Sequence, residues 1–470
     1  MASALVVRGG TVVDPSGPRR VDVLVRDGRI VAVERGLAPD AVDGADVVDA
    51  GGAYVIPGGI DVHTHFALPV GAVTSADDFE SGTLAAACGG TTCVIDFAGA
   101  GREPWQEALA TWHERARGRA VIDYGFHLTV TELPEDPEAV AERFTAYVGH
   151  GVTSVKLYLA YPDRLMVDED TLGRALAASR RTGVGVCVHA EDGATIETLA
   201  GEAIAAGRTG PESLPSVRPS SVEAVAIGRA AALAGTAGAS LYVVHLSSEA
   251  GLQAVRAARA AGVDLHAETC PHYLYLDQSH LEAGDQDFVC APPLRGAADR
   301  AALWGALGDG DVEVVATDHC PFTTADRRRG TGGAGWADFG QIPGGLSGVE
   351  TRLSLVYQGV LSGGLSLERW VDATSGAPAR LFGLDGTKGA VRPGLDADLV
   401  VFDPAATRCL DAASLHSRCD HSPYAGRVVT GWPAVTISRG EVVATAGEPA
   451  SPAPGRGRFV RRSPALRVGA

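Results

Sequence analysis

Two histidines stand one residue apart in the stretch GGIDVHTHF, residues 58–66, at the end of an apolar run. Residues i and i+2 of a β-strand project from the same face, so the imidazoles of His63 and His65 are expected to point the same way. Two such imidazoles can hold a metal ion. An isolated H-x-H pair is more often a pair of loop histidines, so a metal site requires further ligands elsewhere in the chain.

The elements that would position those ligands begin at about residue 58, where apolar strands alternate with amphipathic helices. This alternation is typical of βα units on a parallel sheet. Helical segments such as DPEAVAERFTAYV and SSVEAVAIGRAAALA separate the strands, and the serines of the second could cap it. The strand candidates are GIDVHTHF, TTCVIDFA, IDYGFHLTV, SVKLYLA, GVCVHAE, LYVVHLS, DLHAETCPHYL and VEVVATDHC. Eight such units predict a (β/α)8 TIM-like barrel.

The two ends of the chain share a different pattern, in which short strands alternate with period two between glycine turns. Asp27 and Gly28 suit a tight hairpin. Neither terminal piece could bury a sheet face alone, so we expect both to form one β-sandwich flanking the barrel. The predicted domains are a sandwich of residues 1–57 plus 385–470 and a catalytic barrel of residues 58–384.

Candidate ligands follow several of the predicted strands. His189 ends the fifth strand, His245 the sixth and Asp318 the eighth, and the βα loops at these ends form the mouth of a barrel. A single strand histidine is more often structural, and a strand-end aspartate is often a helix cap. Four imidazoles and one carboxylate that converge from separate strands predict a metal centre.

Lys156 lies in the fourth strand among apolar residues, where burial of an ammonium group costs free energy. An ammonium would also repel a divalent cation. Either the amine is neutral, or carbon dioxide converts it to a carbamate that bridges two metal ions about 3.5 to 4 Å apart. A lysine that reaches the barrel rim is the structural alternative.

The overall composition favours small-molecule chemistry. The formal charge of −17 disfavours binding to nucleic acid or to an anionic membrane. Eight scattered cysteines without a C-x-x-C pair indicate reduced thiols and a cytoplasmic protein. The N-terminus lacks a signal pattern, and no apolar run is long enough to span a membrane. The arginine-rich segment GRGRFVRRSPALRV is expected to be either a solvated tail or a contact with a neighbouring subunit.

Ordered sequence blocks over nearly the whole chain resemble the dihydropyrimidinase and D-hydantoinase branch of the amidohydrolase superfamily. The blocks include PGGIDVHTHF, SVKLYLAY, VHAEDG, LYVVHLSS, ETCPHYLYLD, CAPPLR, ATDHCPF and GRGRFV. The resemblance implies two Zn²⁺ ions per subunit, bridged by Lys156 as N6-carboxylysine. It places His63, His65 and Asp318 on one metal ion, and His189 and His245 on the other.

The resemblance also implies substrate contacts. Tyr161 would hydrogen-bond the oxyanion, although a rim aromatic is the structural alternative. Main-chain groups of Ala291 and Gly344 would bind the ring amide, at positions where relatives commonly carry Ser and Asn. Ala67 replaces a residue that is commonly polar, so we expect an apolar mouth lined by Phe66 and its neighbours Leu68 and Val70.

The implied activity is hydrolysis of the cyclic amide of dihydropyrimidines or 5-substituted hydantoins to N-carbamoyl amino acids, with Asp318 as the proton shuttle. A dihydroorotase typically has an arginine where this chain has Ala67. An allantoinase is the second reading, although its first loop usually carries Trp-Glu-Gly where SADDFESG stands. A catalytically silent scaffold homologue is a further alternative from another class. The resemblance also implies a homotetramer.

Overall fold

The computed structural model describes residues 4–14, 16–37, 44–99, 101–329, 336–450 and 455–466. Eight parallel strands form one sheet in the order β17-β16-β15-β14-β13-β12-β11-β8. Their bounds are β8 (Gly59–Thr64), β11 (Thr91–Ala98), β12 (Asp123–Thr129), β13 (Ser154–Tyr158), β14 (Gly185–His189), β15 (Leu241–Val243), β16 (Leu265–Thr269) and β17 (Val314–Val315). The sheet closes where Thr64 and His319 form a parallel bridge. The predicted (β/α)8 barrel is confirmed.

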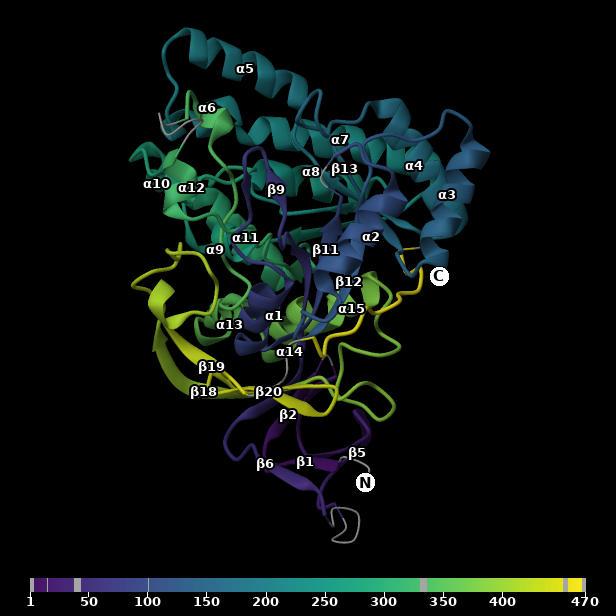
Figure 1. The fold of residues 1–470 in the computed structure, drawn as a ribbon, viewed down its shortest axis with the longest axis vertical. Helices are drawn as coiled ribbons and strands as arrows, with labels where there is room; N and C mark the ends of the chain where they lie inside the picture. The colour runs from purple at the N-terminus through teal and green to yellow at the C-terminus, as the bar shows by residue number, and fades with distance from the viewer. Residues whose placement is uncertain are drawn as a thin grey trace.

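Helices surround this barrel (Figure 1). The main ones are α1 (Phe79–Cys88), α2 (Trp105–Ala116), α3 (Pro137–Gly149), α4 (Glu169–Thr182), α7 (Ser220–Ala237), α8 (Glu249–Ala260), α11 (Ala297–Asp309) and α13 (Arg352–Leu361). Asp136 caps α3, and Pro137 fits its first turn because that position needs no N–H donor. The predicted serine cap of α7 is wrong, because Pro219 precedes the helix and no side chain caps it.

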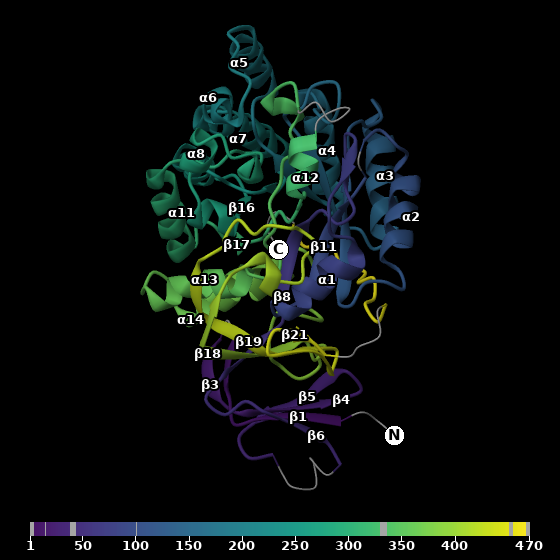
Figure 2. The ribbon, with the colours of Figure 1, turned by 60° about the vertical axis from the view of Figure 1, so that its left-hand side comes forward.

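Both ends of the chain build two stacked sheets beneath the barrel (Figure 1, Figure 2). Their orders are β5-β4-β1-β6 and β21-β20-β19-β18-β7-β2-β3. The strands are β1 (Ala4–Arg8), β2 (Thr11–Asp14), β3 (Gly17–Arg20), β4 (Asp22–Arg26), β5 (Arg29–Glu34), β6 (Asp46–Asp49), β7 (Tyr54–Pro57), β18 (Leu399–Cys409), β19 (Val428–Ser438), β20 (Glu441–Thr445) and β21 (Glu448–Pro449). The predicted flanking sandwich is therefore present, whereas the domain boundaries stay a prediction.

The core between these two sheets takes residues from both ends of the chain. Val7 and Val25 belong to the first sheet, and Val55, Leu399 and Ile437 belong to the second. The predicted hairpin joins β4 to β5, with positive φ angles of 50° at Asp27 and 77° at Gly28. The sandwich thus depends on segments that lie hundreds of residues apart in the sequence.

The described part of the arginine-rich segment packs beneath its own barrel. Phe459 forms a parallel bridge with Tyr124, and the Tyr124 N–H donates to the Arg458 carbonyl at 3.0 Å. Arg462 is 4% exposed and donates to the Phe126 carbonyl and the Ser154 hydroxyl. The expectation of a solvated tail is wrong for this part, because its backbone pairs at Tyr124 and Arg462 is buried, although Arg458 and Arg461 remain exposed.

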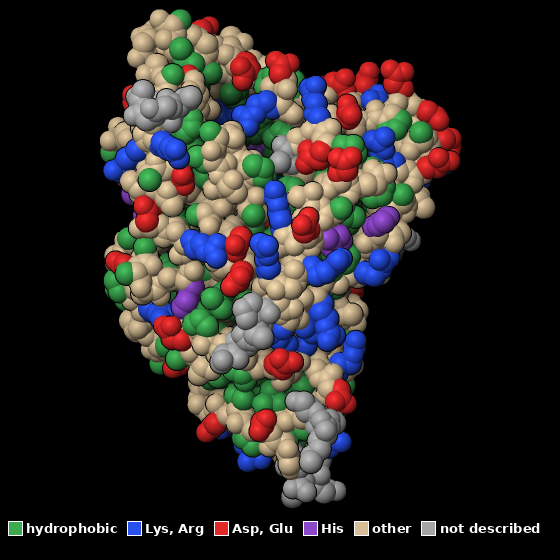
Figure 3. Space-filling view, viewed as in Figure 1, with side chains coloured by type: hydrophobic (Ala, Val, Ile, Leu, Met, Phe, Trp, Pro, Cys, Tyr) green, Lys and Arg blue, Asp and Glu red, His purple; other side chains and the backbone are tan. Residues whose placement is uncertain are grey.

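The distribution of charged side chains on the surface agrees with the mixed, net acidic composition of the chain. Acidic and basic side chains are interspersed over the face in Figure 3, without a broad basic region on that face. Among the described residues, no helix is long and apolar enough to cross a membrane.

Candidate metal centre

Three predicted ligands meet at the mouth of the barrel. His63 lies in β8, His65 follows it, and Asp318 follows β17 with a positive φ of 49°. The Nε2 atoms of His63 and His65 lie 3.1 Å and 3.0 Å from Asp318 Oδ1. One donor atom from each residue therefore lies within 4.8 Å of the others. The first and eighth strands bring this set together because they are neighbours in the closed sheet.

The other two histidines form a second pair beside this set. His189 ends β14 and His245 follows β15, with 2.9 Å between His189 Nδ1 and His245 Nε2. The ring of His245 also lies 5.5 Å from the ring of His63, measured between centroids. All of these imidazoles are buried, and burial is the main cause that lowers the pKa of His189 and of His245. Neutral imidazole is the form that binds a metal ion.

Lys156 lies among these side chains, in β13. It is 1% exposed, and its Nζ atom lies 2.9 Å from His63 Nε2. The same Nζ atom lies 4.2 Å from the ring centroid of Phe97 and 5.0 Å from that of Tyr158. Within the described residues Lys156 has no ion pair, and burial lowers the pKa of its amine. A neutral amine at this position is the form that can react with carbon dioxide.

Two buried carboxylates orient the imidazoles from behind. Glu268 contacts His63 Nδ1, and it accepts hydrogen bonds from the Tyr242 hydroxyl at 2.8 Å and from the backbone N–H of His245 at 3.2 Å. This contact leaves His63 Nε2 directed at the centre. Sequence analysis missed Glu268, although its place in a buried parallel strand was a signal.

The second carboxylate, Glu191, lies 2.9 Å from His189 Nε2. Burial alone would raise the pKa of Glu191, but the adjacent Arg218 holds it at about 2. The Arg218 guanidinium also lies 3.5 Å from the Tyr161 hydroxyl and 5.0 Å from the centroid of that ring. Arg218 thus joins a histidine-bound carboxylate to the predicted oxyanion residue. Sequence analysis missed both Glu191 and Arg218.

A cavity of about 220 Å³ opens onto these groups. Tyr161, Ala291 and Gly344 line it, in agreement with where they were expected to lie. Its apolar wall consists of Leu68, Val70, Leu165, Leu214, Val289, Phe339 and Ile342. An apolar cavity with a few convergent polar groups is the usual form of a small-molecule site.

The prediction that Phe66 lines the mouth is wrong. Phe66 is fully buried, and its ring packs against those of Phe79 and His319. Phe66 lies in the turn that follows β8, and that turn directs its ring away from the cavity, against the first residue of α1. Leu68 and Val70 do line the cavity.

The donor set fits divalent metal ions. Imidazole nitrogens and a carboxylate are ordinary zinc ligands. His65 Nδ1 and His245 Nδ1 are buried and find no hydrogen-bond partner among the described residues, so these rings have unused capacity to bind an ion next to the centre. The short contacts among the donor atoms bring at least three of them within reach of one ion.

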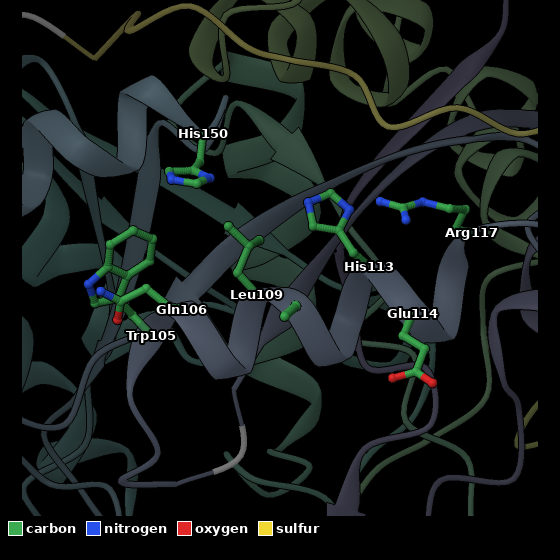
Figure 4. Close-up of a pocket in the computed structure, with 8 residues that line it drawn as sticks. Trp105, Gln106, Leu109, His113, Glu114, Arg117 and His150 are labelled. Carbon is green, nitrogen blue, oxygen red and sulfur yellow. The ribbon is translucent and has the colours of Figure 1, made fainter.

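A larger groove of about 540 Å³ lies on the outer surface (Figure 4). Trp105, Leu109 and His113 line it from α2, and His150 faces it from the end of α3. It lies outside the barrel mouth, and its lining contains none of the predicted metal ligands. The mouth is therefore the candidate active site.

Comparisons with known proteins agree with this geometry. Residues 54–443 match the model of the amidohydrolase family. The chain belongs to the amidohydrolase family. This chain is 41% identical to a D-hydantoinase of Streptomyces coelicolor, and the alignment covers 95% of each chain.

Two further comparisons support the hydantoinase branch. The amidohydrolase is 40% identical to a D-phenylhydantoinase of Escherichia coli, over 98% of each chain. It also superimposes on the crystal structure of a dihydropyrimidinase from Brevibacillus agri with a TM-score of 0.94 and 39% identity, covering 99% of this chain and 100% of that one.

Proposed function

We propose that this amidohydrolase opens the cyclic amide of dihydropyrimidines or 5-substituted hydantoins and releases N-carbamoyl amino acids. The observation that carries the proposal is the meeting of four histidines, Asp318 and Lys156 at the barrel mouth. The near full-length similarity to proteins named D-hydantoinase and dihydropyrimidinase supports the choice of ring.

We assign His63, His65 and Asp318 to one zinc ion, and His189 and His245 to a second. N6-carboxylated Lys156 would be the ligand shared between them. When bound, two zinc ions supply Lewis acidity, which polarises an amide carbonyl and makes a water molecule nucleophilic near neutral pH. The lowered pKa of the buried Lys156 amine, and the absence of an ion pair to it from the described residues, support the carboxylation.

Asp318 is the proposed proton shuttle. Burial would raise the pKa of Asp318, but the neighbouring His63 and His65 hold it well below its usual range. The carboxylate is therefore ionised and can accept a proton as water attacks the carbonyl carbon. It then donates that proton to the departing ring nitrogen, so one residue serves both steps.

Tyr161 and two loop backbones position the substrate in this proposal. The Tyr161 hydroxyl, whose pKa burial raises, remains protonated and donates a hydrogen bond to the developing oxyanion. Such a donor typically contributes about 3 kcal/mol to the transition state. Main-chain groups of Ala291 and Gly344, which line the same cavity, would bind the ring amide.

We also propose a cytoplasmic location and a homotetrameric assembly. All eight cysteines are free, and seven of them are buried, as suits a reducing compartment. The assembly rests on family resemblance, and sedimentation of the purified protein tests it.

A hydrolysis panel tests the activity. Purified zinc-loaded enzyme is given dihydrouracil, hydantoin, 5-phenylhydantoin, allantoin and dihydroorotate, and N-carbamoyl products are measured by chromatography. The apolar cavity wall predicts that 5-phenylhydantoin has a higher kcat/KM than allantoin. Preferred turnover of allantoin or dihydroorotate would contradict the proposed substrate class, and absence of all turnover would support a scaffold.

A further inference from the structure

One cation on the cavity wall takes no part in the proposed chemistry. Arg164 lines the cavity from a tight turn that follows β13. The backbone N–H groups of Arg164, Leu165 and Met166 all donate to the Tyr161 carbonyl, at 3.2, 3.0 and 3.1 Å. Met166 also forms a parallel bridge with Tyr158. The backbone of Arg164 is thus fixed relative to the proposed oxyanion donor.

The guanidinium group of Arg164 has no protein partner. Within the described residues it makes no side-chain hydrogen bond or ion pair, not even with the neighbouring Asp163. Arg218, the other arginine of the cavity, is buried and bound to Glu191. Arg164 alone therefore offers the cavity unused hydrogen-bond donors that a planar anion could accept.

The surroundings of Arg164 favour an anion with an aliphatic stem. The same wall carries Leu68, Val70, Leu165 and Leu214. Arg164 is itself exposed to solvent, so its attraction to an anion is partly screened and should depend on salt concentration.

We propose that Arg164 is a specificity-determining residue that selects rings with an acidic substituent, namely hydantoins with a short carboxyalkyl group on carbon 5. The inference rests on the proposed ring hydrolysis. The carboxylate of the substituent binds the guanidinium and does not react. One water molecule is consumed as a ring C–N bond breaks, a C–O bond forms and the ring nitrogen gains a proton.

The test compares two nearly isosteric substrates, 5-(2-carboxyethyl)hydantoin and its neutral amide 5-(2-carbamoylethyl)hydantoin. The ratio of their kcat/KM values is measured for the zinc-loaded wild type and for Arg164→Gln and Arg164→Glu. We expect the ratio to favour the acid in the wild type, to fall about 5- to 10-fold in R164Q, and to fall further in R164E. The change should lie in KM, and the wild-type preference should weaken as salt rises.

Arg208→Gln is the matched control. Arg208 is exposed, makes no side-chain hydrogen bond or ion pair within the described residues, and does not line the cavity. R208Q removes the same charge and should leave the ratio unchanged. A ratio that is the same in R164Q as in the wild type would overturn the proposal, as would an equal fall in R208Q.

Binding of the reaction products separates this proposal from the proposed activity. Calorimetry measures binding of N-carbamoylglutamate and N-carbamoylglutamine to the zinc-loaded enzyme. We expect tighter binding of the acid in the wild type and loss of that preference in R164Q. If neither ring is opened, the proposed activity fails, while the calorimetry still decides the role of Arg164. Equal affinity for both products in the wild type would refute it.

Discussion

The barrel buries a lysine at each end, and these two are the only lysines in the chain. Lys156 at the mouth has no ion pair within the described residues and contacts an imidazole and two aromatic rings. Lys388 near the floor contacts three carboxylates, with 2.9 Å to Asp123 Oδ2, 3.2 Å to Asp396 Oδ2 and a shorter contact to Asp398. Lys156 is 1% exposed and Lys388 is 2% exposed.

The same side chain therefore meets opposite electrostatic environments. Burial lowers the pKa of Lys156, and the carboxylates near it do not reverse that shift. Burial would also lower the pKa of Lys388, but Asp398 and Asp396 raise it above its usual value. The charged amine at the floor links the barrel strand β12 to the segment that leads into β18. The amine at the mouth, whose pKa burial lowers, is the one available for chemistry.

Replacement of Lys156 gives the largest expected effect. Lys156→Met removes the amine and therefore the proposed shared ligand. We expect the zinc content to fall below half of the wild-type value and kcat/KM to fall by at least about 1,000-fold. Elemental analysis and the hydrolysis assay measure both quantities. Retention of zinc and activity in a folded K156M enzyme would contradict the proposed role.

Replacement of Asp318 separates proton transfer from metal binding. Asp318→Asn preserves size but cannot accept the proton, so kcat should fall by about 100- to 10,000-fold. The four histidines remain, and more than half of the zinc should be retained in elemental analysis. Substantial residual turnover in D318N would exclude Asp318 as the shuttle.

Replacement of Lys388 should affect stability and leave the metal centre intact. Lys388→Met leaves three carboxylates without their shared cation. A loss of about 3–5 kcal/mol in unfolding free energy is expected for one partner removed from a buried ion pair. Denaturant unfolding measures it, with Lys388→Arg as the control that keeps the charge. An unchanged unfolding midpoint in K388M would show that this cluster does not stabilise the fold.

Amine reactivity gives the smallest but most direct contrast between the two lysines. After zinc and bicarbonate are removed, Lys156 borders the open cavity, and its lowered pKa leaves more neutral amine near pH 8. Reductive methylation followed by peptide mass mapping should modify Lys156 in the native protein. Lys388 should react only after unfolding, because its pKa is raised and it is buried at the floor. Equal rates at both sites would refute the contrast.

Sequence patterns predict the barrel and the positions of the proposed metal ligands because both follow from local periodicity. The carboxyl end of each parallel strand lies at the mouth, so the strand pattern alone could place His189 and His245 there. The burial of Phe66 could not be placed in this way, because the strand ends at Thr64 and Phe66 lies in the turn after it.

Residues whose roles depend on distant contacts could not be predicted. Arg218 comes from the segment before α7, and no local pattern indicates that it reaches Glu191 and Tyr161. Lys388 meets Asp123, which lies 265 residues away in the sequence. The burial of Arg462 likewise depends on carbonyl groups of another strand. Such contacts are properties of the tertiary structure rather than of sequence periodicity.

Carbon-13 NMR of the enzyme loaded with zinc and ¹³C-bicarbonate tests the central claim most directly, because the chain contains just two lysines. We expect one carbamate carbon signal, present in the wild type and in K388R and absent from K156M. An active, fully zinc-loaded enzyme without that signal, or a signal that persists in K156M, would contradict it.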